Sequence, residues 1–321
     1  MLTAQDLHGV MAMMPAFATP DAADINATST IDVDNLKAGV DRIIRDGIDV
    51  IATTGSFGEF HTLLPDEFAT LARATVEAVN QRVPLFIGCT ALNSREAVQK
   101  MRVAREAGAE GVLVGVPFYF PSTVENAVRF YTDISALFPD LAIMIYHNPD
   151  LHHVTLPVDC FRQLGQLPNV VAMKDSHRDP RQMLRLRQIV GGKISVFVNQ
   201  LQYYPYTLLG AAGCWSIEAW QGPWPLLRLR DAIAAGDAAT AQEIILALSA
   251  DGDGPPNLSW RETARKISIR YAGYCDPGPL RPPFVEIPAA VDERARRRAA
   301  YWGELCAKYR PQVEGLVAAG T

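Results

Sequence analysis

The stretch VVAMKDS at residues 170–176 decides how this chain is expected to fold and where its chemistry is expected to lie. Four apolar residues lead into Lys174, which is the pattern of a short strand buried on both faces. In a parallel α/β barrel the carboxyl ends of the strands build the active site, and Lys174 stands at such an end. Position alone leaves two interpretations of Lys174 open: a nucleophilic amine, or a lysine paired with Asp175 or another carboxylate.

The same strand-and-helix unit repeats on both sides of this stretch. Strands are expected at residues 10–15, 50–55, 85–90, 111–117, 142–148, 170–175, 195–200 and 213–217. Between the strands, apolar residues recur at the spacing of a helix, and helices are expected at residues 34–47, 65–80, 94–108, 123–138, 157–166, 180–190, 203–211 and 223–236. This alternation predicts a TIM (β/α)₈ barrel, an α/β fold, although alternation alone does not exclude a doubly wound open sheet.

The 321 residues exceed the roughly 250 that a barrel of this kind needs. We therefore expect a catalytic barrel domain at residues 1–236 and a helical extension at residues 237–321 that packs on it. The segment DPGPLRPPFVEIP at residues 276–288 separates two helices of the extension, because its prolines cannot continue a helix.

Composition narrows the class of protein. The net charge of −5 disfavours a general binder of nucleic acid or of anionic membranes. The sequence shows no run of about eighteen apolar residues and no secretory signal pattern, so no membrane span is expected. The five cysteines are dispersed without metal-ligand spacing, which fits free thiols in a reducing compartment. A cytoplasmic enzyme is the expectation.

A second chemical group ends a neighbouring strand. Tyr146 closes the apolar run AIMIY, one strand–helix unit before Lys174, so the two are expected side by side at the barrel rim. Burial would lower the pKa of Lys174, and about three units, roughly 4 kcal/mol, are needed for a useful amine near neutrality. A phenol beside that amine could move protons. The alternative for Tyr146 is a rim tyrosine whose hydroxyl meets water.

Two further patterns allow more than one interpretation. The turn TTGSFGE at residues 53–59 contains Gly55 and Ser56, and its backbone N–H groups could hold a carboxylate, although a tight turn explains it equally well. His147, His152 and His153 lie close together in sequence but lack a spaced carboxylate. We expect no metal there and interpret the histidines as a solvated loop or as substrate contacts.

Taken in order, GSFGE, YHNP and KD resemble the motifs of the dihydrodipicolinate synthase / N-acetylneuraminate lyase superfamily of class I aldolases. The resemblance implies that Ser56 and the backbone N–H of Phe57 bind the carboxylate of a 2-oxo acid. It also implies that Tyr146 is the acid/base and that Lys174 forms a Schiff base. No metal or organic cofactor is implied, because the lysine imine is the electron sink.

One branch of that superfamily is more similar. The opening segment, TALNSRE at residues 90–96, CWS at 214–216 and GPLRPPF at 278–284 resemble hydratase-aldolases that cleave an arylidene pyruvate to an aromatic aldehyde and pyruvate. The trans-o-hydroxybenzylidenepyruvate and 2′-carboxybenzalpyruvate enzymes belong to it. Two alternatives stay open: a lyase or dehydratase for an aliphatic or sugar-derived 2-oxo acid, and a non-catalytic small-acid sensor. Members are commonly tetramers, so a homotetramer is implied.

The resemblance also supplies weaker candidates for substrate contact. Some could pack against an aromatic ring of the substrate, and one is expected at a subunit interface. They are Gly55, Thr90, Tyr119 (the interface tyrosine), His147, Asn148, Trp215 and Phe284. This chain departs from the branch at Val285, where the branch has an asparagine, and at His147, where a small residue is usual. Because of both departures, the sequence does not predict which substituent the aromatic ring of the substrate carries.

Overall fold

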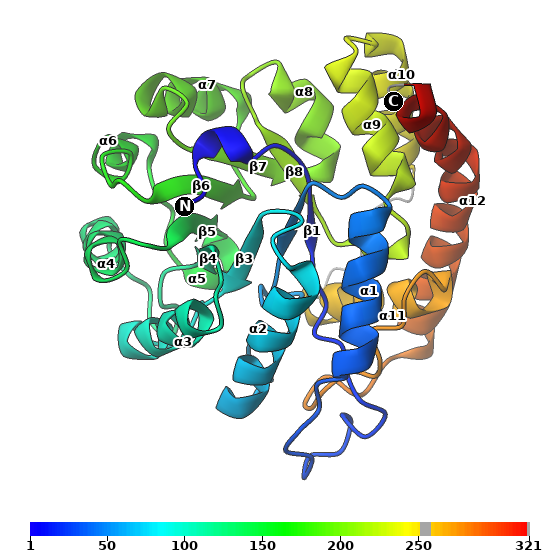
Figure 1. Cartoon of the computed structure of the whole chain (residues 1–321), viewed down its shortest axis with the longest axis horizontal. Coiled ribbons are helices and arrows are strands. Elements are labelled where there is room, and N and C mark those ends of the chain that lie inside the picture. The colour runs from blue at the N-terminus through cyan, green and yellow to red at the C-terminus, as the bar shows by residue number, and fades with distance from the viewer. Residues whose placement is uncertain (251–257, 320–321) are drawn as a thin grey trace.

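The computed structural model describes residues 1–250 and 258–319. Eight parallel strands close into a barrel in chain order, and β1 pairs with β8 (Figure 1). The strands are β1 (Gly9–Met13), β2 (Val50–Ala52), β3 (Leu85–Gly88), β4 (Gly111–Val114), β5 (Ala142–His147), β6 (Val170–Asp175), β7 (Ser195–Asn199) and β8 (Gly213–Ser216). The predicted barrel is confirmed, and its closure excludes the open sheet.

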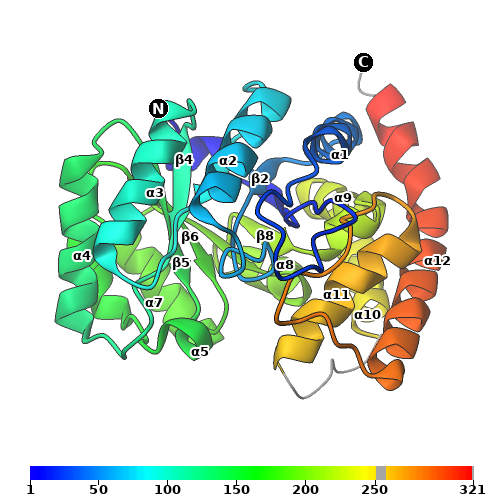
Figure 2. The same cartoon turned by 90° about the horizontal axis from the view of Figure 1, so that it is seen from below.

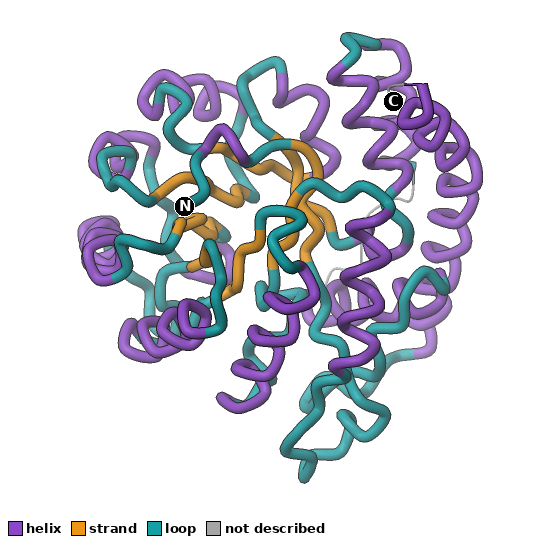
Figure 3. The backbone as a smooth tube through the Cα atoms, in the orientation of Figure 1, coloured by secondary structure: helices purple, strands orange, loops and turns teal. Residues whose placement is uncertain are grey.

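Helices surround the barrel, and Figure 3 shows the strands inside this helical ring. The helices are α1 (Val33–Arg45), α2 (Pro65–Val79), α3 (Ser94–Glu106), α4 (Val124–Leu137), α5 (Pro149–His152), α6 (Phe161–Leu164), α7 (Pro180–Val190), α8 (Tyr203–Thr207) and α9 (Trp224–Ala234). Short 3-10 turns are η1 (Ala4–Asp6), η2 (Val158–Cys160), η3 (Gln200–Gln202) and η4 (Glu218–Gln221).

The observed elements differ from the expected ones mainly at strand ends. β2 stops at Ala52, because the next residues leave the strand for a turn at 53–59. The loop expected after β5 contains the short helix α5, which Pro149 opens at the first helical position. The helix expected at 157–166 divides into η2 and α6.

Three more helices follow the barrel: α10 (Ala238–Ser249), α11 (Leu258–Ala272) and α12 (Ala289–Ala319). α12 packs against α9 and α11, while α11 contacts η4, the turn that follows β8 (Figure 2). α11 thereby lies near the carboxyl ends of the strands. The domain boundary at 236/237 remains a prediction, and residues 251–257 and 320–321 of the predicted extension lie outside the described residues.

The barrel core explains why the strands are apolar almost throughout. Every residue of β5 and β6 is buried, since one face fills the barrel and the other lies under the helices. The buried residues of these two strands that are not apolar lie at their carboxyl ends, where the site is found. Within the described residues, no helix has the length and apolar character needed to cross a lipid bilayer.

Candidate active site

Three side chains meet inside the carboxyl end of the barrel. Tyr146 of β5 and Lys174 of β6 are register partners, and residues so paired point to the same face of a sheet. The Lys174 Nζ atom lies 4.4 Å from the centroid of the Tyr146 ring and 3.7 Å from that of the Trp215 ring on β8. The two strand ends predicted as neighbours are therefore in contact.

The amine of Lys174 is buried and lies apart from Asp175. Its side chain is 3% exposed, and Nζ donates a hydrogen bond to the Ser176 Oγ atom at 3.4 Å. Burial lowers the pKa of Lys174 to about 7, although the charges of Glu262 and Asp175 oppose that shift. An amine with this pKa is about half deprotonated at neutrality, which a nucleophile requires. The alternative pairing with Asp175 is excluded, because that carboxylate bonds to His147.

Tyr146 is held by polar neighbours on its hydroxyl. The Oη atom of Tyr146 lies 3.0 Å from the Ser56 Oγ atom and accepts a longer hydrogen bond, 3.5 Å, from Asn148 Nδ2. Burial raises the pKa of Tyr146, while these hydrogen bonds oppose the rise. The phenol therefore stays protonated at neutral pH, and Ser56 continues the hydrogen-bonded path toward the turn at 53–59. The alternative of a hydroxyl in open water does not hold, since Tyr146 is 4% exposed.

The turn at residues 53–59 is strained and is held by long-range contacts. Two of its non-glycine residues have left-handed backbones, Thr54 with φ 42° and Glu59 with φ 53°. The hydroxyl of Thr54 donates to the Gly88 carbonyl at 2.8 Å. The buried carboxylate of Glu59 accepts from Lys266 of α11 at 2.5 Å and from Arg281 at 2.9 Å. These contacts fix the turn beside Tyr146.

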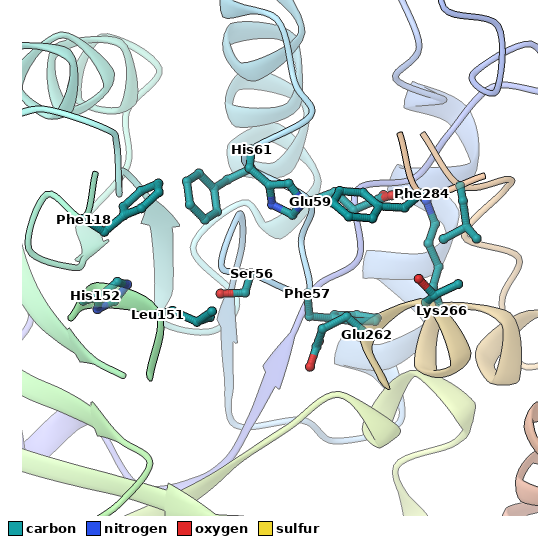
Figure 4. A pocket seen from close by; sticks show the side chains of 13 residues that line it. Ser56, Phe57, Glu59, His61, Phe118, Leu151, His152, Glu262, Lys266 and Phe284 are labelled. Carbon is teal, nitrogen blue, oxygen red and sulfur yellow. Dashed lines mark hydrogen bonds and ion pairs between the residues drawn. The ribbon is translucent and has the colours of Figure 1, made fainter. Parts of the chain in front are cut away.

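Gly55 lets this turn approach the barrel closely. A Cβ atom added at Gly55 would lie 3.0 Å from the Met13 side chain and 3.9 Å from the Tyr146 ring. The next two residues, Ser56 and Phe57, both line a cavity of about 250 Å³ that opens above the strand ends (Figure 4). The structure thus places the predicted carboxylate-binding turn between the phenol and this cavity.

The cavity has a largely aromatic wall. Its lining residues are Ser56, Phe57, Glu59, Phe60, His61, Phe118, Leu151, His152, Glu262, Thr263, Lys266, Leu280 and Phe284. The rings of Phe60 and Phe118 meet edge to face at 5.7 Å, and those of His61 and Phe284 at 5.3 Å (Figure 4). Phe284, one of the candidate substrate contacts, thus lines the cavity together with Phe60 and His61.

Two polar lining residues have roles that the sequence did not reveal. His152 packs its ring edge to face on Tyr146 at 4.8 Å, and burial, followed by the charge of Lys174, lowers its pKa to about 3. It is therefore a neutral wall of the site. Glu262 of α11 brings a carboxylate to the cavity and accepts a hydrogen bond from Arg265 at 2.8 Å. No motif marked Glu262, because its place depends on how α11 packs.

Asn148 and Trp215 contact Tyr146 and Lys174 but do not line the cavity, and three further predicted contacts do neither. His147 follows Tyr146 on β5 and so faces the helices, where its Nδ1 atom bonds to Asp175 at 2.8 Å. We therefore withdraw its assignment to substrate. The hydroxyl of Thr90 accepts from the Gly115 N–H at 2.9 Å and is buried. Tyr119 is 71% exposed and contacts Phe120, so its predicted place at a subunit interface remains a prediction.

The histidines do not gather as a group. His152 lies beside Tyr146, whereas His147 is on the other face of β5. Potential ligand atoms of His147, Asp175 and His177 do lie within 4.8 Å of one another. Their hydrogen bonds already use these atoms: Asp175 Oδ1 contacts both imidazoles, and His147 Nε2 accepts from the Leu156 N–H. This cluster serves as a hydrogen-bonded support of β5 and β6.

Comparisons with known proteins agree with this geometry. The model of the dihydrodipicolinate synthetase family matches residues 11–250. The chain is 31% identical to the trans-o-hydroxybenzylidenepyruvate hydratase-aldolase of Pseudomonas putida over 322 residues, 96% of each chain. It is 27% identical to the trans-2′-carboxybenzalpyruvate hydratase-aldolase of Nocardioides sp. (strain KP7) over 323 residues, again 96% of each. The structure of PhdJ bound to a substrate intermediate superposes with a TM-score of 0.90 at 30% identity, covering 96% of this chain and 99% of that one.

Proposed function

This chain belongs to the dihydrodipicolinate synthetase family, and from that membership we propose that it is a Schiff-base hydratase-aldolase cleaving an arylidene pyruvate to an aromatic aldehyde and pyruvate. The observation that carries the proposal is the buried amine of Lys174, with a pKa of about 7, in contact with the phenol of Tyr146. An amine and a proton donor in contact at a sheltered site are the requirements of imine chemistry. A non-catalytic sensor would have no use for either.

The pyruvyl end of the substrate binds at the strand ends. Its carboxylate meets the turn at Ser56 and Phe57, where backbone N–H groups and a hydroxyl can donate. The neutral amine of Lys174 attacks the 2-oxo carbon, and the carbinolamine loses water to give an iminium. Tyr146 supplies and accepts protons at the oxygen that leaves and, later, at the carbon next to the iminium. No metal or organic cofactor is needed for these steps.

The aryl end occupies the cavity above the strand ends. The rings of Phe57, Phe60, Phe118 and Phe284 offer an apolar wall against which an aromatic ring can pack. A polyhydroxylated chain would place many of its hydroxyl groups against this apolar surface, where they lose their hydrogen bonds to water, which costs binding free energy. This lining favours an arylidene substrate over the alternative of an aliphatic or sugar-derived 2-oxo acid.

The bond changes balance without an external reagent. Water adds to the aryl-bearing carbon of the conjugated iminium, the alkene electrons move toward nitrogen, and the adjacent carbon takes a proton. The new hydroxyl then loses its proton, and the carbon–carbon bond breaks to release the aldehyde. Its electron pair forms an enamine with Lys174. Protonation of the enamine and hydrolysis of the imine release pyruvate.

Two measurements test the proposal. Borohydride with pyruvate should attach a reduced pyruvyl group to Lys174 in the wild type and not to a Lys174→Ala variant, as read by peptide mass. A panel of arylidene pyruvates, followed by loss of enone absorbance, should show turnover. Cleavage of an aliphatic substrate with no aryl turnover would support the alternative, and an unlabelled Lys174 would refute the covalent mechanism.

The same relatives motivate two broader proposals, a role in aromatic-compound degradation and a homotetrameric assembly. The exposed Tyr119 and Phe120 on the loop after β4 would find partners in a neighbouring subunit of such an assembly. Sedimentation equilibrium of the wild type measures the subunit number directly. A monomer at micromolar concentration would contradict the tetramer.

A further inference from the structure

We infer that Glu262 is the general base at the aryl-bearing carbon, where it takes a proton from the water that adds and from the hydroxyl that is then cleaved. This inference rests on the proposed function and assigns one proton acceptor within it. Tyr146 is then confined to the pyruvyl end. Glu262 stands in no motif of the barrel, so sequence patterns did not predict it.

Glu262 is placed by α11 at the junction of the amine and the cavity. Its side chain lines the cavity together with Ser56, and the Ser56 hydroxyl lies 3.0 Å from that of Tyr146. Figure 4 shows the Glu262 carboxylate beside Phe57 and turned away from His61. The side chain is 27% exposed, so water can reach it. A substrate whose 2-oxo carbon meets Lys174 would extend its aryl-bearing carbon past this carboxylate.

The electrostatics agree with this placement. Burial lowers the pKa of Lys174, and the charge of Glu262 is the largest influence opposing it. Burial raises the pKa of Tyr146, and the charge of Glu262 adds to the rise. A carboxylate acts on both groups only if it lies near both, because charge interactions weaken with distance and with water between the charges.

A series of alternating charges holds the carboxylate in place. Arg265, one turn further along α11, donates from Nη1 to Glu262 Oε1 at 2.8 Å. The same guanidinium lies 3.7 Å from Glu218 of η4, which in turn accepts from Arg298 of α12 at 2.5 Å. One oxygen of Glu262 is thus fixed by the helical extension. Its Oε2 atom has no hydrogen-bond partner among residues 1–250 and 258–319 and can meet water.

Other titratable groups that line the cavity are less suited to accept this proton. Glu59 is held by Lys266 and Arg281. Burial lowers the pKa of His152 to about 3, which makes it a very weak base. Burial also lowers the pKa of His61, whose ring contacts Phe60 and Phe284. His61 is the competitor that an experiment must exclude.

The proposed steps return every proton. Glu262 Oε2 takes a proton as the water oxygen bonds to the aryl-bearing carbon, and the alkene electrons pass through the iminium to give an enamine. Tyr146 protonates the neighbouring carbon, which restores the iminium, and the Glu262 acid returns its proton to the tyrosinate through water. Glu262 then takes the hydroxyl proton as the carbon–carbon bond breaks and the aldehyde leaves an enamine behind. Tyr146 protonates the enamine carbon and recovers its proton from the Glu262 acid through water, so both groups end as they began.

The test separates the aryl end from the pyruvyl end in the full-length enzyme. With pyruvate in deuterium oxide, exchange of the methyl protons reports imine and enamine formation, which need Lys174 and Tyr146 only. With an arylidene pyruvate, aldehyde release reports the whole reaction. Glu262→Gln should lower aldehyde release by about 100-fold or more, while methyl exchange and borohydride labelling stay within about threefold of the wild type.

Two matched variants complete the design. Glu304→Gln makes the same chemical change at an exposed position of α12 and should leave both readouts unchanged. His61→Gln should lower aldehyde release by less than about tenfold. The inference is overturned if Glu262→Gln releases aldehyde like the wild type, if it loses methyl exchange in the same proportion, or if His61→Gln alone shows the selective loss. A wild type that exchanges pyruvate but cleaves no arylidene pyruvate instead contradicts the proposed function.

Discussion

The two faces of β5 and β6 carry neighbouring residues under opposite conditions. Tyr146 and Lys174 face the barrel interior and are register partners, while His147 and Asp175, the next residues, are partners on the outer face. Inside, the amine is buried with two aromatic rings and one hydroxyl partner. Outside, Asp175 contacts two imidazoles and Arg178.

The difference lies in whether buried charge is compensated. Burial opposes the charge on Asp175, yet hydrogen bonds from His147 and His177 and the charge of Arg178 hold the pKa of that carboxyl well below its usual range. Burial of Lys174 is not offset in this way, and its pKa falls to about 7. One face therefore supports the strands, and the other holds a reactive amine at the expense of stability.

The sharpest test of this contrast is Lys174→Met. It removes the nucleophile, so turnover and borohydride labelling should fall below detection. It should also stabilise the protein. The folded-state pKa of about 7 lies below the ordinary lysine pKa of 10.5, so the buried amine destabilises the fold below pH 10.5 and does so fully below about pH 7. The upper bound at pH 7 is about 4 kcal/mol, or several degrees in Tm.

Thermal unfolding near pH 7 measures this gain, with Lys193→Met as control. Lys193 is exposed, so its replacement should change neither activity nor Tm. A Lys174→Met variant that is less stable than the wild type would show that the amine is compensated inside the fold, and the contrast between the two faces would fail.

Tyr146→Phe should give the next largest effect. The ring keeps its packing on Lys174 and His152, but the proton donor is lost, so kcat should fall by about 10²- to 10³-fold with little change in KM. Tyr206→Phe is the matched change on α8, outside the barrel, where the hydroxyl donates to the carbonyl of Arg178, the ion-pair partner of Asp175. It should cost about 1 kcal/mol of stability and leave kcat within about threefold. Equal losses of kcat would remove the distinction between the faces.

The pH profile measures the same amine without mutation. Below about pH 7 the protonated Lys174 cannot attack, so kcat/KM should fall about tenfold per pH unit, and above it the profile should be flat. The raised pKa of Tyr146 keeps the phenol protonated across this plateau. Initial rates from about pH 5 to 9 test this expectation. A kcat/KM that still rises about tenfold per pH unit up to pH 9 would mean that the pKa of Lys174 lies near its ordinary value and that the amine is solvated.

The fold could be predicted from the sequence because its signals are local. Each strand is a short apolar run, and several helices begin at a residue whose side chain caps them, such as Asp32, Asn93 and Asp179. Lys174 and Tyr146 were predictable for the same reason, since both end such runs. The misplacement of His147 was avoidable: strand alternation puts it opposite Tyr146.

The rest of the site depends on contacts between distant segments. Glu59 and Arg281 are 222 residues apart in sequence, yet their ion pair fixes the turn beside the phenol. Glu262 reaches the cavity through α11, whose position follows from packing against η4 and α12. Periodicity predicts these helices but not where they dock, so a single sequence cannot place their side chains.

His147→Leu should give the smallest effect on chemistry and completes the comparison. The change removes a donor to Asp175 and the acceptor of the Leu156 N–H, both buried, and should cost about 2–4 kcal/mol of stability. Relative kcat/KM values across a panel of arylidene pyruvates should stay within about twofold, because the side chain faces the helices. His8→Leu, an exposed control, should change neither quantity. If the ranking of substrates changed while stability held, the outer face would set specificity, and the division of roles between the two faces would be wrong.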